Sequence, residues 1–410
     1  MIGQVSLLKE QMDKQQNELF GKRIGIYTGI GTSHSWLWFV DALERMGFDN
    51  LIFMDENALR EEDGIKKVDA LLLSGGDTFA IAEGMAEKGT RNLERFIGEG
   101  GIYFGSCAGA YLPLKSSQYP LSLLNLAGVK ISNLSKLSPI ALRHSEKFCT
   151  PYGCHYVFHP VRDEVKIRCS NGCFSRNKKE IKAPLYGGPC MEASADVIPL
   201  AFYQGFTDKT LFLVNEKLAE ETVIGKMAVC CKMVDKGRLY LSGPHLEHPY
   251  YPEANQLLME ILYDGLKGKH IRYHDNEKDE EFKDCSGFLR ELKMELSGAR
   301  IIAFSLEREL VTWLIGRKVY EPEKFRVFLD ALWKRLGFLG KHSQRGISGE
   351  ELRDLIVIAK VIKDRLKLLK TEIQNSSDTA GLVEEIISDL RKLSSSFMNL
   401  YFRMKRRQGR

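Results

Sequence analysis

Short apolar segments alternate with amphipathic segments over the first hundred residues, and this alternation limits the folds open to the chain. KRIGIYTG, NLIFMD, VDALLLSGG and GIYFG each have the composition of a strand, and each ends in glycine, serine or aspartate. The segment at 36–48 has apolar residues at helical spacing. Strands that alternate with helices predict an α/β fold with a mostly parallel sheet and helices on both faces. In such sheets, sites form at the carboxyl ends of the strands, so the loops that follow the strands matter most.

The pattern changes twice further along the chain. Residues 119–235 are strand-rich and irregular, and a charged segment, YHDNEKDEEFKD, begins at Tyr273. Beyond it, apolar residues recur at helical spacing. The two clearest stripes are Leu352, Leu355, Ile356, Ala359, Ile362, Leu366 and Leu369, and Val383, Ile386, Ile387, Leu390, Leu393 and Phe397. We therefore predict an N-terminal helix at 1–21, an α/β domain at 22–272 and an all-α domain at 273–410.

Composition limits the environment and the partners. The chain has no run of 18 apolar residues and no apolar centre near its N-terminus, so we expect a cytoplasmic protein with reduced cysteines and no membrane partner. The net charge of +5 comes from residues 273–410, much of it from the tail RMKRRQGR. No basic stripe is interleaved with aromatic residues, so no nucleic-acid partner is expected.

The segment GSCAG sets Cys107 between two glycines, directly after a strand. A strand, a tight small-residue turn and a helix form the layout of a nucleophile elbow, which exposes the side chain at the edge of the sheet. The start of a helix also favours the thiolate, which is the reactive form. A buried structural cysteine in a glycine-rich turn is the alternative.

A cysteine nucleophile needs a base and a group that orients the base. LYLSGPHLEHP supplies His245 and Glu247, which would share one side of a strand because their spacing is two residues. His248 would then point the other way. The oxyanion of an acyl-transfer reaction would be held by the N–H of Ala108 and by one N–H from Gly75 or Gly76, at the end of a neighbouring strand.

These motifs, in this order, resemble the class I glutamine amidotransferase-like superfamily. YTGIGTS, SGGDTFAIAEGM, GSCAGAY, LYGGPCM and GRLYLSGPHLEHP are most similar to the N-terminal domain of biotin–protein ligases, a family also found as stand-alone proteins. The resemblance implies a flavodoxin-like sheet, a catalytic triad of Cys107, His245 and Glu247, and no cofactor. It also implies substrate-binding residues, which are Gly31, Thr32, Asp77, Tyr111, Gly187 and Gly188.

The chain departs from these families in two ways. Glutamine-hydrolysing members commonly carry a glutamine soon after the nucleophile, where this chain has Ala110 and Tyr111. The chain also shows no adenylate-binding loop and no ligase catalytic domain after residue 270. The resemblance therefore supplies neither glutamine as the substrate nor biotin ligase activity.

The remaining cysteines and one glycine loop have two interpretations each. Two loosely spaced cysteine pairs could hold zinc, but their spacing favours reduced thiols and no metal; they are Cys149, Cys154, Cys169 and Cys173. Cys230 and Cys231 lie in an apolar strand and are expected in the core. YTGIGTSHS could cradle a phosphate, but it lacks the lysine of a P-loop, so we expect the rim of the active site.

The leading hypothesis is a cysteine-dependent amidase or glutamine amidotransferase-like hydrolase, with a small-molecule or peptide amide or an ester as substrate. One alternative is a non-catalytic ligand-binding or regulatory module that retains the fold. Another is a scaffold whose helical domain docks a partner protein. A hydrogen bond between Cys107 and His245 would favour the first.

Overall fold

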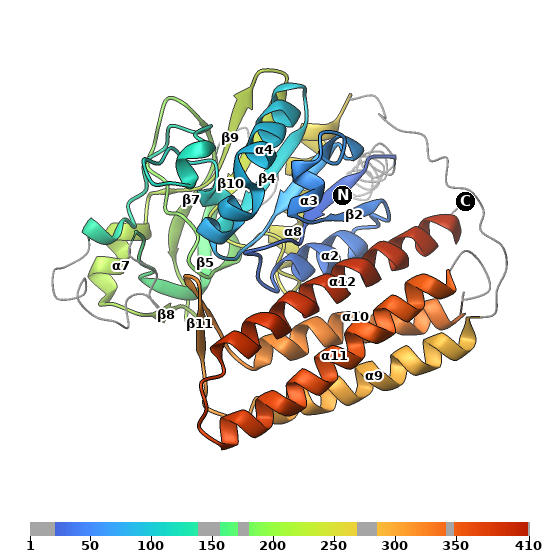
Figure 1. Cartoon of the computed structure of the whole chain (residues 1–410). Helices are drawn as coiled ribbons and strands as arrows, with labels where there is room; N and C mark the ends of the chain where they lie inside the picture. Colours follow the sequence, from blue (N-terminus) through green and yellow to red (C-terminus); the bar gives the residue numbers. More distant parts are fainter. Residues whose placement is uncertain (1–20, 138–155, 171–179, 269–284, 342–347, 409–410) are drawn as a thin grey trace, which may run out of the picture. The chain divides into compact units, whose positions relative to one another are not determined.

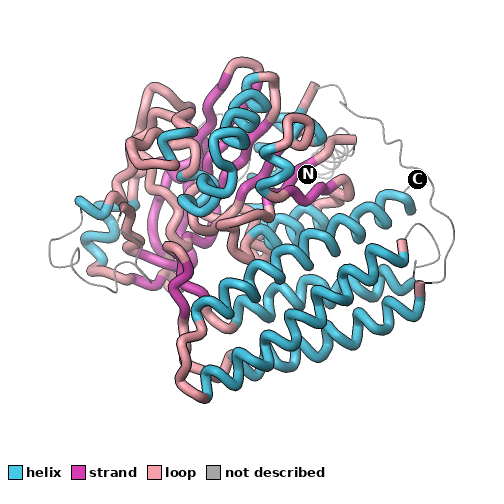
Figure 2. Tube along the Cα trace, in the orientation of Figure 1, coloured by secondary structure: helices cyan, strands magenta, loops and turns pink. Residues whose placement is uncertain are grey.

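The computed structural model describes residues 21–137, 156–170, 180–268, 285–341 and 348–408 (Figures 1 and 2). Contacts divide the chain into two units, Met1–Tyr273 and His274–Arg410. Nearly all of the N-terminal helix predicted at 1–21 lies outside the described residues. That each unit folds without the other stays a prediction.

The first unit is built on a sheet whose first half is parallel. Its strands lie in the order β2 (Leu51–Met54), β1 (Ile24–Tyr27), β3 (Ala70–Leu73), β4 (Ile102–Ser106) and β10 (Gly237–Ser242), each parallel to the next. When only these five parallel strands are numbered along the chain, their order is 2-1-3-4-5, which is the order of flavodoxin-like sheets. The predicted fold class is therefore confirmed, and the apolar runs that predicted the strands are buried because helices cover both faces.

Two pairs of helices flank the parallel strands (Figure 1). α3 (Glu56–Arg60) packs with α4 (Thr78–Gly98). On the other face lie α2 (Trp36–Arg45) and α8 (Pro252–Leu266), which are joined by a hydrogen bond of 2.9 Å from the Arg45 side chain to Asn255. Three short 3₁₀ turns occupy Ile65–Lys67, Leu121–Leu123 and Ser135–Leu137.

The second half of the sheet is antiparallel and corresponds to the strand-rich part of the sequence. Next to β10 lie β9 (Met227–Val234), β7 (Ile198–Phe206), β5 (Val161–Cys169) and β6 (Glu180–Leu185), in this order. The short strand β8 (Leu211–Phe212) pairs with β5, and α7 (Glu216–Val223) precedes β9. Cys230 and Cys231 lie buried on β9, as predicted.

The second unit contains four long helices. They are α9 (Ser286–Leu306), α10 (Glu323–Lys341), α11 (Gly349–Gln374) and α12 (Ala380–Gln408). α9 packs against α10 and α11, and α12 packs against the same two helices. The two apolar stripes found in the sequence are buried in α11 and α12, which confirms the helical character of this region.

A β-hairpin between α9 and α10 was not predicted. Its strands are β11 (Trp313–Ile315) and β12 (Lys318–Tyr320), joined by a two-residue turn in which Gly316 has a φ of 59°. The indole of Trp313 donates a hydrogen bond of 2.8 Å to the hydroxyl of Thr379, just before α12. The signal was present, since aromatic and β-branched residues flank a glycine turn, but the strands are too short to interrupt a helical pattern.

Candidate active site

Cys107 lies in a strained turn between β4 and α5 (Ala108–Tyr111). Its φ of 53° is unfavourable for a residue other than glycine, at a cost of about 1–3 kcal/mol that the surrounding structure must offset. The turn is packed tightly, because a Cβ on Gly105 would overlap the carbonyl of Gly109, and a Cβ on Gly109 would overlap the carbonyl of Leu73. These two glycines therefore let the elbow form.

The helix after the elbow is short. α5 has 4 residues, so its dipole gives a thiolate at Cys107 little support. The side chains around the sulfur must supply that support instead.

His245 and Glu247 form a buried pair beside the elbow. The distance from His245 Nδ1 to Glu247 Oε1 is 2.7 Å, and the residues are 2% and 0% exposed. Both lie beyond the end of β10, where the N–H of His248 donates to the carbonyl of His245 across a turn. The strand period that we used to place them was therefore wrong: a turn brings the two side chains together, and the His245 N–H is bonded to Pro184 at the end of β6 (2.9 Å).

Two serines that the sequence analysis missed hold Glu247 in place. Its Oε1 accepts hydrogen bonds from the hydroxyls of Ser74 (2.8 Å) and Ser106 (2.9 Å) as well as from His245. Among the described residues its other oxygen, Oε2, is buried without a hydrogen-bond partner. Ser74 follows β3 and Ser106 ends β4, so the rule that sites form at strand ends could have flagged both.

The two histidines of this turn have opposite pKa shifts. Burial lowers the pKa of His245, but the Glu247 charge and the interaction with Cys107 outweigh burial, so the pKa rises above its usual value. Because Nδ1 is held by Glu247, Nε2 is the ring nitrogen available for proton transfer. Burial, reinforced by the charge on His245, lowers the pKa of His248 to about 4, so His248 is neutral at pH 7.

The aromatic rings of Trp38 and Tyr186 line one side of the site. The ring of Trp38 lies 5.0 Å from His245 and 4.5 Å from His248, measured between ring centroids. His248 is therefore not turned away, contrary to our prediction; it packs on the same tryptophan as His245. The carbonyl of Tyr186 lies 4.0 Å from the Cys107 sulfur, and Cys107 is 9% exposed. The thiol is thus largely enclosed.

The predicted oxyanion donors differ in their surroundings. Among the described residues, the N–H groups of Gly75 and Ala108 donate no hydrogen bond. A Cβ on Gly75 would lie 3.0 Å from Cε1 of His245, so this glycine borders the ring. A Cβ on Gly76 would instead overlap the carbonyl of Gly31. Of the two glycines, Gly75 is the one beside His245.

Three of the predicted substrate-binding residues build the loops at this edge of the sheet. Gly31 has a φ of 83°, and Thr32 forms a bridge with Gly76. The Thr32 hydroxyl donates to Gly29 (2.7 Å). The carboxylate of Asp77 caps α4 by accepting hydrogen bonds from the N–H groups of Phe79 and Ala80. Each has a structural role here, and contact with a substrate stays a prediction.

The other three lie on the antiparallel side. The Tyr111 hydroxyl accepts a hydrogen bond of 2.7 Å from the Asn133 amide. Gly187 has a φ of 102° and faces the ring of His159, and Gly188 packs so closely on Gly243 that a side chain would not fit. Their contact with a substrate is likewise a prediction.

Nothing in the described part of the chain forms a metal centre: no three His, Cys, Asp or Glu side chains are grouped to hold an ion there. Of the four cysteines with a zinc-like layout, Cys169 is buried at the end of β5. The others, Cys149, Cys154 and Cys173, lie outside the described residues. Among the described helices, none has the length and apolar character needed to cross a membrane.

The parallel strand order, the cysteine elbow and the adjacent His-Glu pair define a class I glutamine amidotransferase-like protein. The sequence profile of the family described as "Biotin-protein ligase, N terminal" matches residues 22–303. The chain belongs to this family. No curated protein sequence matches it.

Solved structures of similar fold include glutamine amidotransferases. One glutamine amidotransferase is 16% identical, with 60% of this chain and 99% of that chain covered and a TM-score of 0.37. A glutamine amidotransferase from Thermotoga maritima is 8% identical, with the same coverage and TM-score. A ThuA-like protein from Bacteroides uniformis is 11% identical over 62% of this chain and 95% of its own, with a TM-score of 0.39.

Proposed function

We propose that this protein is a cysteine-dependent amidase or amidotransferase-like hydrolase that cleaves a small-molecule or peptide amide. The observation that carries the proposal is the constellation at the elbow. Cys107 occupies a strained turn, its thiol is one of the groups that raise the pKa of His245, and Glu247 accepts a hydrogen bond of 2.7 Å from Nδ1 of the same imidazole. A nucleophile, a base and an orienting carboxylate are what acyl transfer through a thioester needs.

The raised pKa of His245 suits a resting thiolate–imidazolium pair. In the first step the Cys107 sulfur forms a bond to the carbonyl carbon, and the carbonyl π electrons move to oxygen. The N–H groups of Ala108 and Gly75 hold this oxyanion. Its collapse breaks the C–N bond, and the imidazolium of His245 gives its proton to the departing amine.

The second half of the reaction releases the acyl group. Neutral His245 takes a proton from water, the resulting hydroxide attacks the thioester carbon, and the C–S bond breaks to return the thiolate. Glu247 keeps the Nδ1 proton in place throughout, so that Nε2 carries every transfer.

The enclosure of the sulfur bears on the class of substrate. Cys107 is 9% exposed, and its sulfur lies 4.0 Å from the Tyr186 carbonyl. A slender carboxamide on a flexible stem reaches such a thiol more easily than the backbone of a folded protein. We therefore favour small amides and unstructured peptides over protein substrates.

Alkylation of the thiol tests the proposal. With limiting iodoacetamide at pH 7, peptide mass spectrometry should show Cys107 labelled before the buried thiols Cys230 and Cys285. His245→Ala should slow this labelling by about 10²-fold, since it removes the imidazolium that stabilises the thiolate, and Glu247→Gln should slow it less. If amide hydrolysis is found, Cys107→Ser should reduce it by orders of magnitude.

The enclosed sulfur also suits a second function, a ligand-binding or regulatory module without turnover. That function predicts labelling of Cys107 no faster than labelling of Cys230, and no dependence on His245. Such a result would show that Cys107, His245 and Glu247 do not act as a catalytic triad, and it would favour a binding module.

A further inference from the structure

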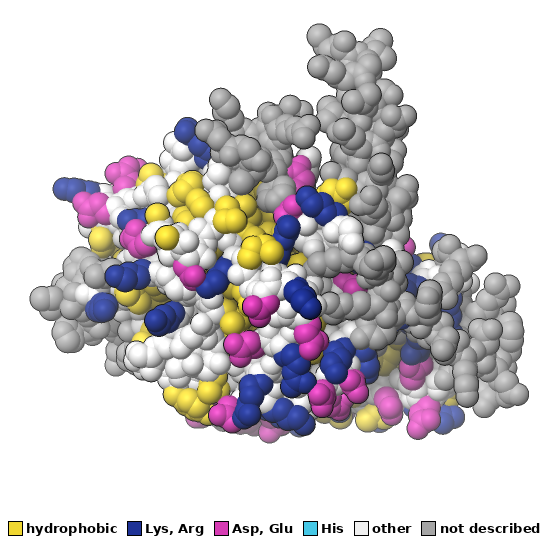
Figure 3. Space-filling model, turned by 90° about the horizontal axis from the view of Figure 1, so that it is seen from above, with side chains coloured by type: hydrophobic (Ala, Val, Ile, Leu, Met, Phe, Trp, Pro, Cys, Tyr) yellow, Lys and Arg dark blue, Asp and Glu magenta, His cyan; other side chains and the backbone are white. Residues whose placement is uncertain are grey.

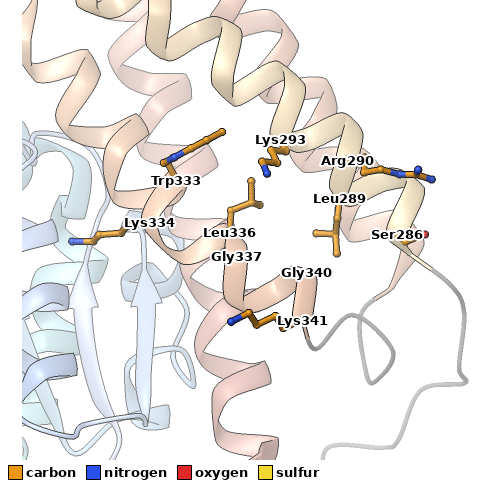
Figure 4. A pocket seen from close by; sticks show the side chains of 10 residues that line it. All are labelled: Ser286, Leu289, Arg290, Lys293, Trp333, Lys334, Leu336, Gly337, Gly340 and Lys341. Atoms are coloured by element: carbon orange, nitrogen blue, oxygen red, sulfur yellow. The ribbon is translucent and has the colours of Figure 1, made fainter.

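The helical unit contains an open groove at one end of α9 and α10. Its volume is about 780 Å³, within the usual range of ligand and peptide sites. Figure 4 shows Leu289 from α9 and Leu336 from α10 reaching into it from opposite sides. None of the residues that carry the proposed chemistry lies in this unit, so the inference below is independent of the proposed function.

Two glycines shape the α10 side of the groove. Trp333, Gly337 and Gly340 lie four and three residues apart and so share one face of the helix. The tryptophan is followed along this face by two positions without side chains, and a Cβ at either glycine would meet no described atom within 4 Å. Glycine in a helix lowers its stability, yet no close packing in the described residues requires it here. The free space beside α10 would let another backbone approach closely.

The charges around the groove are of one sign. Arg290, Lys293 and Lys341 line it, and among the described residues none of the three forms an ion pair. Lys293 lies 5.8 Å from the Trp333 ring as a cation–π partner. None of the described side chains that line the groove is acidic.

Several cations elsewhere in the same unit are paired. Arg300 bonds Asp330, Arg326 bonds Glu307, Arg365 bonds Asp389 and Arg403 bonds Glu351. On the face of the molecule drawn in Figure 3, Lys and Arg side chains are likewise interspersed with Asp and Glu. The groove therefore combines an apolar floor with a rim of unpaired cations among the described residues.

We propose that this groove docks an acidic amphipathic helix of a partner protein. An apolar side chain of the partner would lie on Leu289 and Leu336, and its backbone would pass over Gly337 and Gly340. Its carboxylates would face Arg290, Lys293 and Lys341. Helix-in-groove recognition reads such i, i+3, i+4 and i+7 anchors. A polyphosphate or a nucleic acid would be complementary only to the cationic rim. It would leave unused the apolar floor and the free space beside Gly337 and Gly340.

Fluorescence anisotropy with the full chain and synthetic probes tests this. The probe is a labelled 16-residue helical peptide of glutamate and alanine with leucines at i, i+3, i+4 and i+7. A scrambled peptide of the same composition lacks the apolar stripe, and a third peptide keeps the stripe but carries lysine for glutamate. The first should bind at least tenfold more tightly than either control, with an affinity that falls as salt is added.

Variants then locate the site. Lys293→Glu should weaken binding about tenfold, whereas the same charge change at exposed Lys360 on α11 should not. Gly337→Gln should also weaken binding about tenfold, because the new side chain fills the free space beside α10. The melting temperature should stay the same or rise, because glutamine is a better helix former than glycine. This variant separates a lost site from a lost fold.

Three results would overturn the proposal. The first is equal binding of the stripe and scrambled peptides. The second is unchanged affinity in Gly337→Gln. The third is binding of a single-stranded oligonucleotide as tightly as the stripe peptide and with the same dependence on Lys293, which would make the groove a non-specific anion surface.

Discussion

The elbow at the edge of the sheet and the four-helix unit are stabilised in opposite ways. The elbow places a cysteine at positive φ, buries a carboxylate and a histidine, and leaves one carboxylate oxygen unpaired. The helices of the second unit instead bury continuous apolar stripes, and most of their buried residues are aliphatic. The elbow thus combines backbone strain with a buried carboxylate–imidazole pair. In the helical unit the buried carboxylate of Glu295 is paired with Lys363, and apolar packing fills most of the interior.

The difference has a consequence for mutation. Contacts at the elbow are made by backbone atoms and short polar side chains from several separate segments, so small changes there have no room to relax. Contacts in the helical unit are made by side chains along single helices, so the outcome depends on which face a residue occupies. The four predictions below run from the largest expected effect to the smallest.

Adding one methyl group should separate the two regions most clearly. Gly105→Ala should destabilise the first unit by about 3 kcal/mol or prevent its folding, because the new Cβ meets the backbone of Gly109, which cannot rotate away. Gly337→Ala should stabilise the second unit by up to about 1 kcal/mol, because its Cβ meets no described atom and alanine favours the helix. Hydrogen exchange resolved by peptide measures each unit separately. A neutral Gly105→Ala would show that the elbow is not tightly packed.

Removing a core side chain should affect the helical unit according to the face it occupies. Leu366→Ala should cost about 2–5 kcal/mol, since Leu366 is fully buried in α11. Val357→Ala on the same helix should change stability by less than about 0.5 kcal/mol, because Val357 is 60% exposed. Chemical denaturation of both variants gives the comparison. Equal losses would mean that α11 is covered on both faces.

Removing one hydroxyl group should lower the free energy of unfolding at the elbow but leave it nearly unchanged on the surface of a helix. Ser106→Ala removes a hydrogen bond to the Glu247 carboxylate, at a cost of about 1.5–3 kcal/mol. If Ser106 positions the pair, the pH profile of Cys107 alkylation should also shift, which a purely structural effect would not cause. Thr371→Val on α11, whose exposed hydroxyl bonds its own helix, is the matched control and should be near neutral. An unshifted profile in Ser106→Ala would assign the serine to stability alone.

The two histidines should give opposite dependences of stability on pH. The folded-state pKa of His245 is raised, so its stabilising contribution is full below pH 6.5 and is lost as pH rises through the folded value. The folded-state pKa of His248 is lowered to about 4, so the fold should lose on the order of 1 kcal/mol as pH falls from 7 to 5. His245→Gln should therefore lose more stability at pH 6 than at pH 9, and His248→Gln should abolish the acid loss. Urea unfolding across pH measures both, and the same sign for both variants would contradict the assigned shifts.

The sequence by itself determined the elements whose signals are local. Apolar runs predicted the parallel strands, and helical spacing predicted the buried face of α11 residue by residue and that of α12 as far as Phe397. The glycines around Cys107 predicted a tight turn after β4. The spacing of apolar residues and the residues that form a turn are properties of neighbouring positions in the chain, so a single sequence is enough to predict these elements. The hairpin at Trp313–Tyr320 marks the limit of this method, because strands of 3 residues carry too short a pattern.

Tertiary structure alone decided how the site is assembled. The sequence named His245 and Glu247, but a turn beyond β10, not a strand, brings them together. Ser74 and Ser106 reach Glu247 from positions 173 and 141 residues away, and His248 packs on Trp38 rather than pointing outward. The antiparallel order of β9, β7, β5 and β6 is equally non-local. Hydrogen bonds and ring contacts between distant segments depend on how the sheet is ordered, and periodicity along one segment holds no information about that order.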